Sequence, residues 1–174
     1  MMDTWEKRRE RLENMPAGRL WATRPARRRL VAVAVAALML LWAGLVVIAR
    51  YAPSDLARNV YLSMFGISLL AGLPVTGWLH AGTRGVLYLP ERFLDERQLA
   101  ERRRAFTSAH RATSLVLGSL LVLANLWSFE GGRLTFTVPV ALLAPLALTL
   151  FVTHYTTPLL VAAWQATDPP DDDE

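Results

Sequence analysis

Four long stretches of the chain contain no Asp, Glu, Lys or Arg, and segments rich in charge separate them. The stretches cover residues 30–49, 60–79, 112–129 and 136–157. A bilayer core of about 30 Å is spanned by roughly 20 helical residues, and a helix satisfies its own backbone hydrogen bonds there. The pattern predicts an all-α membrane protein, a four-helix transmembrane bundle (up-down-up-down) with a cytoplasmic helical extension.

Overall composition conceals this segregation. The 174 residues are 53% hydrophobic and 20% charged, values that alone resemble a soluble protein. The chain has no cysteine, which excludes disulfides, cysteine-based catalysis and cysteine-ligated zinc or iron–sulfur sites. The distribution of charge along the chain therefore carries more information than its average.

The first and last stretches each leave an alternative open. Residues 30–49 exceed the apolar core of a signal peptide, so we expect an uncleaved membrane anchor, with cleavage after Ala49 as the alternative. The fourth stretch stays apolar as far as Trp164, which requires tilting, a kink at Pro145 or extension beyond the bilayer core.

Basic residues indicate the orientation. They number nine in residues 1–29, two in 50–59, seven in 80–111 and one in 130–135. Cytoplasmic flanks carry the excess of Lys and Arg, so both termini are expected in the cytoplasm, including the acidic tail 165–174. All basic residues except one are Arg, which has GC-rich codons, and we therefore expect a bacterial cytoplasmic (inner) membrane location.

The N-terminal arm, residues 1–29, is basic and amphipathic. Residues 3–14 are predicted to form a short helix capped by Asp3, with Trp5 on its apolar side. Arg27, Arg28 and Arg29 follow just before the first span. They are candidates for contact with anionic lipid headgroups, and the alternative is a topology signal. No nucleic-acid-binding motif accompanies these charges.

The cytoplasmic connection is predicted to contain an Arg/Glu helix over residues 90–111. Pro90 suits a helix start, and no breaker separates it from the third span, so one continuous rod is expected. Candidate residues for contact with a partner or with lipid are Arg97, Arg102, Arg103 and Arg104. The alternative is a solvated stalk.

Inside the predicted spans there is no fixed charge. Ion-coupled transporters, proton relays and voltage sensors depend on ionisable groups within the membrane. The chain also lacks the sequence motifs of phosphate-binding loops, serine hydrolases and zinc proteases. We therefore expect a non-enzymatic protein.

The three histidines, His80, His110 and His154, are the candidate cofactor ligands. Each lies on a stripe that we expect to form a contact between helices, which would turn the histidines inward. The stripes are Ser63, Gly66, Leu70, Leu73 and Gly77; Ser114, Gly118, Leu121 and Asn125; and Ala144, Ala147 and Phe151. The hypothesis that follows is a haem b or metal site built on His80 and His154; the alternative is ordinary hydrogen bonding.

Several other polar or kinked positions have two interpretations. Asn125 either lines a pore or hydrogen-bonds between helices. The prolines at 74, 139, 145 and 158 are either hinges or static kinks.

We expect the chain to be an interaction, assembly or regulatory subunit that needs no cofactor. Its expected partners are the lipid bilayer, anionic lipid headgroups, and a membrane protein or a second copy of itself. A haem b-like redox protein and a small-solute channel or transporter subunit are the alternative functions.

Overall fold

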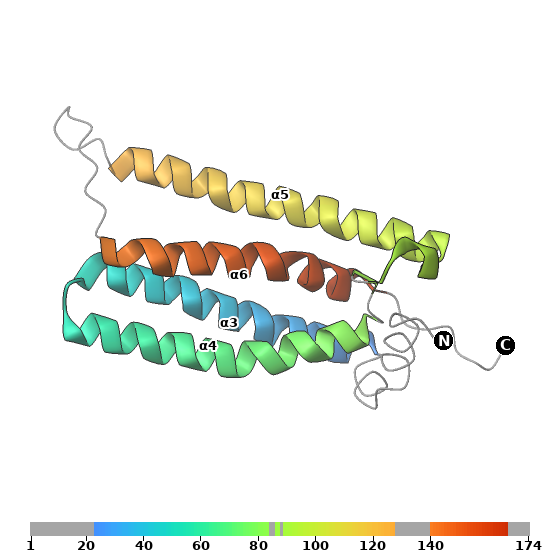
Figure 1. Cartoon of the computed structure of the whole chain (residues 1–174), viewed down its shortest axis with the longest axis horizontal. Coiled ribbons are helices and arrows are strands. Elements are labelled where there is room, and N and C mark those ends of the chain that lie inside the picture. Colours follow the sequence, from blue (N-terminus) through green and yellow to red (C-terminus); the bar gives the residue numbers. More distant parts are fainter. Residues whose placement is uncertain (1–22, 84–85, 88, 128–139, 167–174) are drawn as a thin grey trace, which may run out of the picture.

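The computed structural model describes residues 23–83, 86–87, 89–127 and 140–166, and these residues form helices and no strand (Figure 1). The long helices are α3 (Arg24–Tyr51), α4 (Asp55–Gly82), α5 (Glu96–Trp127) and α6 (Val140–Gln165), and a 3-10 turn, η1 (Glu91–Phe93), precedes α5. All four long helices are long and apolar enough to cross a membrane. The described parts of the four charge-free stretches each lie within one of these helices.

The turn between α3 and α4 follows from local sequence. Ala52 ends α3, and the Ala52–Pro53 peptide is cis. Ser54 then caps α4, because its hydroxyl accepts a hydrogen bond of 3.1 Å from the backbone N–H of Ala57. Asp55 in the first turn adds a negative charge where the helix dipole favours one.

Helix α5 begins at Glu96, not at Pro90 as predicted. Asp95 Oδ1 accepts from the Gln98 N–H at 2.6 Å, and Gln98 Oε1 accepts from the Asp95 N–H at 3.2 Å. This reciprocal pair is a capping box, which stops the helix from extending backwards. The predicted continuity with the third span is confirmed from Glu96 onward, because α5 runs unbroken to Trp127.

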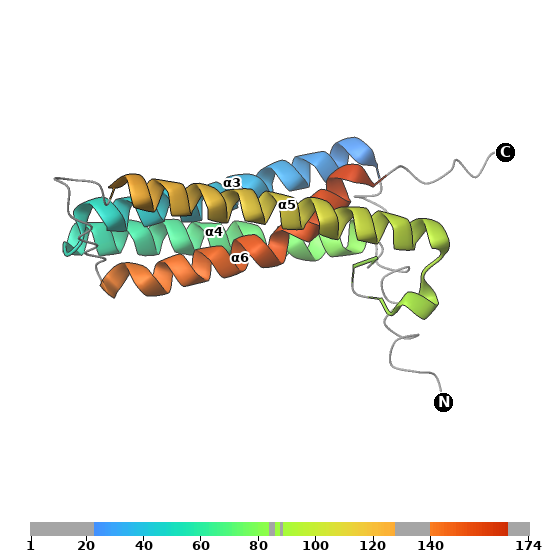
Figure 2. The same cartoon turned by 90° about the horizontal axis from the view of Figure 1, so that it is seen from above.

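The four helices lie side by side, and α6 contacts all three of the others. Helix α3 packs against both α4 and α6, while α5 packs along α6 (Figures 1 and 2). The start of α3 and the end of α6 lie at one end of the molecule, beside the end of α4. Helix α5 is the least buried of the four and extends beyond the others at that end.

The three predicted stripes do not form the contacts between the helices. On α4, Leu70 is 80% exposed and Leu73 is 67% exposed. A Cβ added at Gly66, Gly77 or Gly118 would have no neighbour within 4 Å. The other members are also exposed: Ser63, Ser114, Leu121, Asn125, Ala144, Ala147 and Phe151.

Helices α3 and α4 meet instead through a different face of α4. The ring of Tyr61 packs against Gly44, where an added Cβ would lie 3.0 Å from Tyr61 Cδ2. About two turns farther along α4, the buried hydroxyl of Ser68 donates a hydrogen bond of 2.8 Å to the carbonyl of Ala37 on α3. Close approach at a glycine and a hydroxyl bonded across helices are both typical of helix pairs in membranes.

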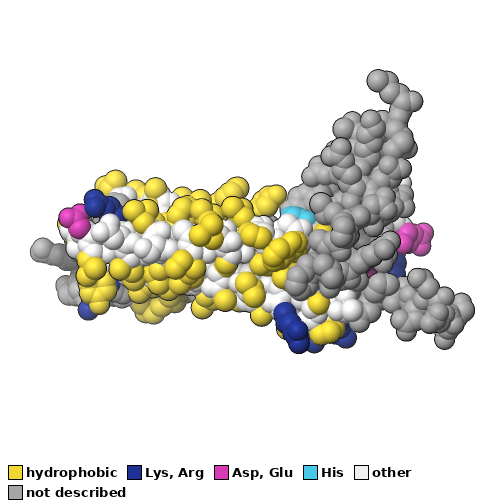
Figure 3. All heavy atoms as spheres, turned by 90° about the horizontal axis from the view of Figure 1, so that it is seen from below, with side chains coloured by type: hydrophobic (Ala, Val, Ile, Leu, Met, Phe, Trp, Pro, Cys, Tyr) yellow, Lys and Arg dark blue, Asp and Glu magenta, His cyan; other side chains and the backbone are white. Residues whose placement is uncertain are grey.

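A compact apolar core lies toward the end where α3 begins. Its members come from all four long helices and from the segment after α4, and they are Leu30, Val31, Ala34, Val75, Leu79, Leu87, Ala105, Leu159, Leu160 and Ala163. Many large hydrophobic side chains are exposed on all four helices, and Figure 3 shows hydrophobic side chains along the helices with basic side chains toward both ends. Such extensive exposed apolar surface is unusual for a soluble monomer.

Candidate functional site

At the end of the molecule where α3 begins, Arg27 is buried. Its side chain is only 2% exposed, and Nη2 donates a hydrogen bond of 2.7 Å to the carbonyl of Ala166. The last carbonyls of a helix have no partner within that helix, so Arg27 satisfies one of them for α6. Arg27 therefore joins α3 to α6, and its burial does not support the predicted contact with lipid headgroups.

The next two arginines, Arg28 and Arg29, have different surroundings. The guanidinium of Arg28 lies 4.5 Å from the ring centroid of Trp164, a cation–π contact between α3 and α6. Arg29 is exposed. Trp5, the other predicted lipid-contact residue of the N-terminal arm, lies outside the described residues, as do residues 3–14.

On α5, two of the predicted contact arginines have partners within the chain. Arg102 donates a hydrogen bond of 2.9 Å to the carbonyl of Leu89, which holds the segment before α5 against the helix. Arg97 pairs with Glu101 at 3.3 Å, as its spacing predicts. Arg103 and Arg104 are exposed, and we find no internal bond that would occupy their guanidinium groups within the described part of the chain.

Arg103, Arg104, His110 and Arg111 form one exposed side of α5, which we call the α5 basic face. Residues seven or eight apart return to the same side of a helix. Ala105 belongs to the same core as Leu30 at the start of the apolar part of α3, so the basic face begins near that level. It then extends about 9 Å farther along α5 to Arg111, at 1.5 Å per residue.

The basic face therefore runs beside helices whose outer surfaces are apolar at the same level. A helical side chain leans toward the N-terminus of its helix. For Arg111 this is the direction of the polar end, so a long arginine side chain can carry its charge back toward an interface. The placement fits a charged surface at the margin of an apolar layer.

The three histidines lie on three different helices. His80 is in the last turn of α4, next to Leu79 in the apolar core. His110 is exposed on the α5 basic face, and His154 is exposed on α6 about eleven residues before its end. With 1.5 Å per residue, His154 is roughly 16 Å from the end of α6 that Arg27 contacts. Of the three histidines, only His154 lines the cavity described next.

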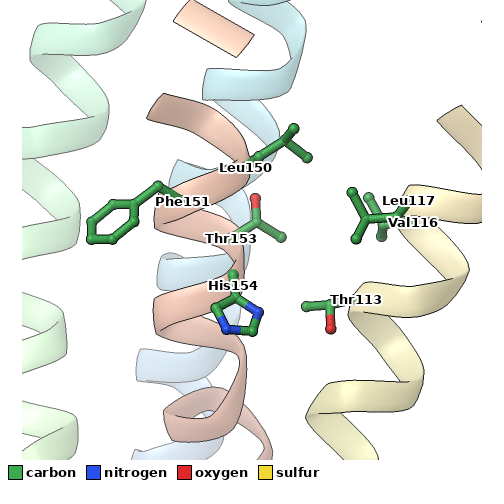
Figure 4. A pocket seen from close by; sticks show the side chains of 7 residues that line it. All are labelled: Thr113, Val116, Leu117, Leu150, Phe151, Thr153 and His154. Atoms are coloured by element: carbon green, nitrogen blue, oxygen red, sulfur yellow. The ribbon is translucent and has the colours of Figure 1, made fainter. Parts of the chain in front are cut away.

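A cavity of about 240 Å³ lies between α5 and α6 (Figure 4). His154 and Thr113 face each other across it, one from each helix. The remaining lining residues are Val116 and Leu117 of α5, and Leu150, Phe151 and Thr153 of α6. The lining holds no Asp, Glu, Lys or Arg, so an uncharged guest suits it.

A hydrogen-bonded pair supports the wall of this cavity from behind. Trp42 Nε1 on α3 donates to Thr153 Oγ1 at 3.2 Å, and Thr153 Oγ1 in turn donates to the carbonyl of Thr149 at 2.7 Å. Thr113 Oγ1 donates within α5, to the carbonyls of Ala109 at 2.9 Å and His110 at 3.1 Å. The hydroxyl groups of Thr113 and Thr153 therefore both donate to backbone carbonyls of their own helices.

No cluster of three or more His, Cys, Asp or Glu that could bind a metal ion occurs among the described residues. Of the residues lining the cavity, only His154 could ligate haem iron, and no second histidine lines it. The cavity is also smaller than the pockets of about 300–1,000 Å³ that bind drug-sized ligands. The haem hypothesis with His80 and His154 stays a prediction that this cavity does not support.

Sequence reasoning did not find the Trp42–Thr153 pair or the bond from Arg27 to Ala166. The spacing of Thr149, Thr153 and Thr157 indicates a hydroxyl-bearing side of α6, because residues four apart share one side of a helix.

Asn125, expected in a pore or between helices, donates a hydrogen bond of 2.8 Å to the carbonyl of Leu121 in its own helix. Pro74, Pro145 and Pro158 lie inside continuous helices, and Pro139 is outside the described residues.

Comparison of the chain with models of protein families, with curated proteins and with solved structures finds no match.

Proposed function

We propose that the chain is an integral membrane protein of the bacterial inner membrane, with its four long helices crossing as an up-down-up-down bundle. The end that carries Arg27, Arg28 and the start of α5 is on the cytoplasmic side, together with both termini. Support comes from the length and apolar surface of the four helices and from the concentration of basic residues in the segments flanking this end.

The absence of cysteine makes this orientation straightforward to test. Leu56→Cys and Glu91→Cys introduce single thiols at exposed positions, near the α3–α4 turn and in η1. In intact spheroplasts, a membrane-impermeant maleimide is expected to label Leu56→Cys, and Glu91→Cys only after permeabilisation. The reverse pattern would overturn the proposed orientation. Labelling of both positions before permeabilisation would overturn the proposal that α4 crosses the membrane between them.

Within the membrane, the chain acts as a non-enzymatic interaction or assembly subunit, and α5 supplies the contact. The observation that carries this proposal is the unequal burial of α5. The helix packs along α6 and exposes the α5 basic face on its cytoplasmic half, followed by exposed Leu115, Leu121 and Leu126. A partner with acidic residues next to its own span would match both halves of this surface.

The test is affinity purification after cross-linking in native membranes. The variant Arg103→Glu/Arg104→Glu/Arg111→Glu reverses the α5 basic face, and Arg50→Glu is the matched control, an exposed arginine in the last turn of α3. The wild type and the control are expected to recover one partner, or a second copy, in a fixed ratio, and the triple variant to lose it. A wild type that recovers nothing in fixed ratio, or a triple variant that keeps its partner, would overturn the proposal.

A further inference from the structure

The side chain of His154 is unusual among the residues that line the α5–α6 cavity. It stands on the apolar helix α6 beside Leu150, Phe151 and Thr153. Within the described part of the chain, no hydrogen bond or ion pair to its imidazole is found. An ionisable side chain at such a position in a transmembrane helix is costly unless it has a partner, and it commonly marks a functional site.

The bonds already made by the two threonines limit which hydrogen bonds the cavity can offer a guest. Both threonine hydroxyl protons point to backbone carbonyls, and the hydroxyl of Thr153 already accepts from Trp42. Thr113 Oγ1 therefore retains acceptor capacity only. A neutral imidazole offers one N–H donor and one acceptor nitrogen. A guest oxygen can thus accept a hydrogen bond from His154, and a guest hydroxyl can instead donate to the acceptor nitrogen of that ring.

The shape of the cavity limits the size of the guest. A volume of about 240 Å³ accommodates a ring-sized head but not a large cofactor. The cavity lies between α5 and α6, and its lining residues His154 and Phe151 are exposed, so a guest dissolved in the acyl-chain region can enter from the side. The lining without fixed charge disfavours an ionic head group.

We propose that the cavity between α5 and α6 binds the head of an uncharged, membrane-dissolved quinone or prenylated phenol, with an oxygen of the ring hydrogen-bonded to His154. Val116, Leu117 and Leu150 contact the ring, and the apolar tail lies outside among the lipid chains. The inference rests on the membrane embedding proposed above and is independent of partner binding through the α5 basic face.

The experiment uses the full-length protein in nanodiscs and a photoreactive azido-benzoquinone with a decyl tail. Illumination cross-links the probe, and mass spectrometry maps the labelled residues. The expected result is saturable labelling of 113–117 or 150–154 that excess decyl-benzoquinone displaces. His154→Phe keeps a ring of similar size but removes the hydrogen bond, and it is expected to weaken binding about three- to tenfold.

Two further variants make the test specific. Leu117→Trp fills the cavity from α5 and is expected to abolish the labelling, whereas Leu123→Trp, the same substitution at an exposed α5 position outside the lining, is expected to leave it unchanged. Because His154 and Leu117 lie on different helices, misfolding of one variant, checked by circular dichroism, still leaves the other informative.

Labelling that does not saturate, or that maps elsewhere, would overturn the proposal. So would loss with Leu117→Trp but unchanged binding with His154→Phe, because the site would then accept any acyl chain. Failure here with correct maleimide labelling of Leu56→Cys and Glu91→Cys would reject the ligand site and leave the membrane arrangement standing.

Discussion

The guanidinium of Arg27 donates a 2.7 Å hydrogen bond to the backbone carbonyl of Ala166, and this contact joins the first turn of α3 to the residue that follows α6. The two residues are 139 positions apart in the chain. Arg28 reinforces the same junction by lying over Trp164. The first and last membrane-sized helices are therefore attached to each other at one end by basic residues.

Replacing Arg27 with methionine should loosen this junction. Methionine keeps an unbranched apolar stem but cannot bond the carbonyl of Ala166, and a hydrogen bond from a charged group contributes about 1.5–3 kcal/mol. We expect a lower free energy of unfolding in detergent and faster amide hydrogen exchange in the last turn of α6. Arg29→Met, an exposed position two residues on, is the control and should behave as wild type. Equal effects of both variants would contradict a structural role for Arg27.

Gly44→Val should separate α3 from α4. An added Cβ at Gly44 already lies 3.0 Å from the Tyr61 ring, and the two further methyl groups of valine increase the overlap. Overpacking of this kind costs about 1–3 kcal/mol. Gly66→Val makes the same change on α4 at a position with no neighbour within 4 Å. Thermal unfolding in detergent micelles should show a clear loss for Gly44→Val and little change for Gly66→Val.

The same pair of glycines shows where sequence reasoning succeeded and where it failed. The membrane-sized helices were predictable because charge cannot enter an apolar layer without cost, so the four stretches were visible along the chain. Which face of each helix packs inward was not predictable. In a soluble protein the polar side identifies the exposed face, but in these helices both faces are apolar. The prediction of a helix contact at Gly66 and Gly77 is therefore wrong, and the close contact lies at Gly44.

The surroundings of the candidate functional residues were also only partly predictable from the sequence. Exposure of Arg103 and Arg104 follows from their place in a highly charged segment. The burial of Arg27 does not, because it depends on Ala166, far away in the sequence. His154 was predictable as a candidate ligand, because it is the one histidine in a stretch without Asp, Glu, Lys or Arg. Its position at a cavity depends on α5, and no local pattern around His154 specifies which helix lies beside it.

Asp95→Ala should weaken the beginning of α5. It removes the carboxylate that accepts from the Gln98 N–H at 2.6 Å, and loss of such a cap costs about 1 kcal/mol. Amide hydrogen exchange measured by mass spectrometry should become faster in the first turn, residues 96–99, and stay unchanged beyond residue 110. Glu91→Ala, which lies in η1 outside the cap, is the control. If both variants exchange alike, the capping box does not set the start of α5.

Trp42→Phe and Thr153→Val should show an energetic coupling across α3 and α6. The indole N–H of Trp42 donates to Thr153 Oγ1 at 3.2 Å, and each substitution removes one side of that bond while keeping most of the apolar volume. Hydrogen bonds between membrane helices contribute about 0.6 kcal/mol on average and up to about 1.7 kcal/mol. The free energies of unfolding of the wild type, the two single variants and the double variant, measured in mixed micelles, form a double-mutant cycle that isolates this contribution. The double variant should be less destabilised than the sum of the single variants by an amount in that range.

Thr156→Val is the control, because the hydroxyl of Thr156 bonds the carbonyl of Val152 in its own helix; its effect should be additive with that of Trp42→Phe. Strict additivity in both cycles would mean that the Trp42–Thr153 bond does not hold α6 against α3.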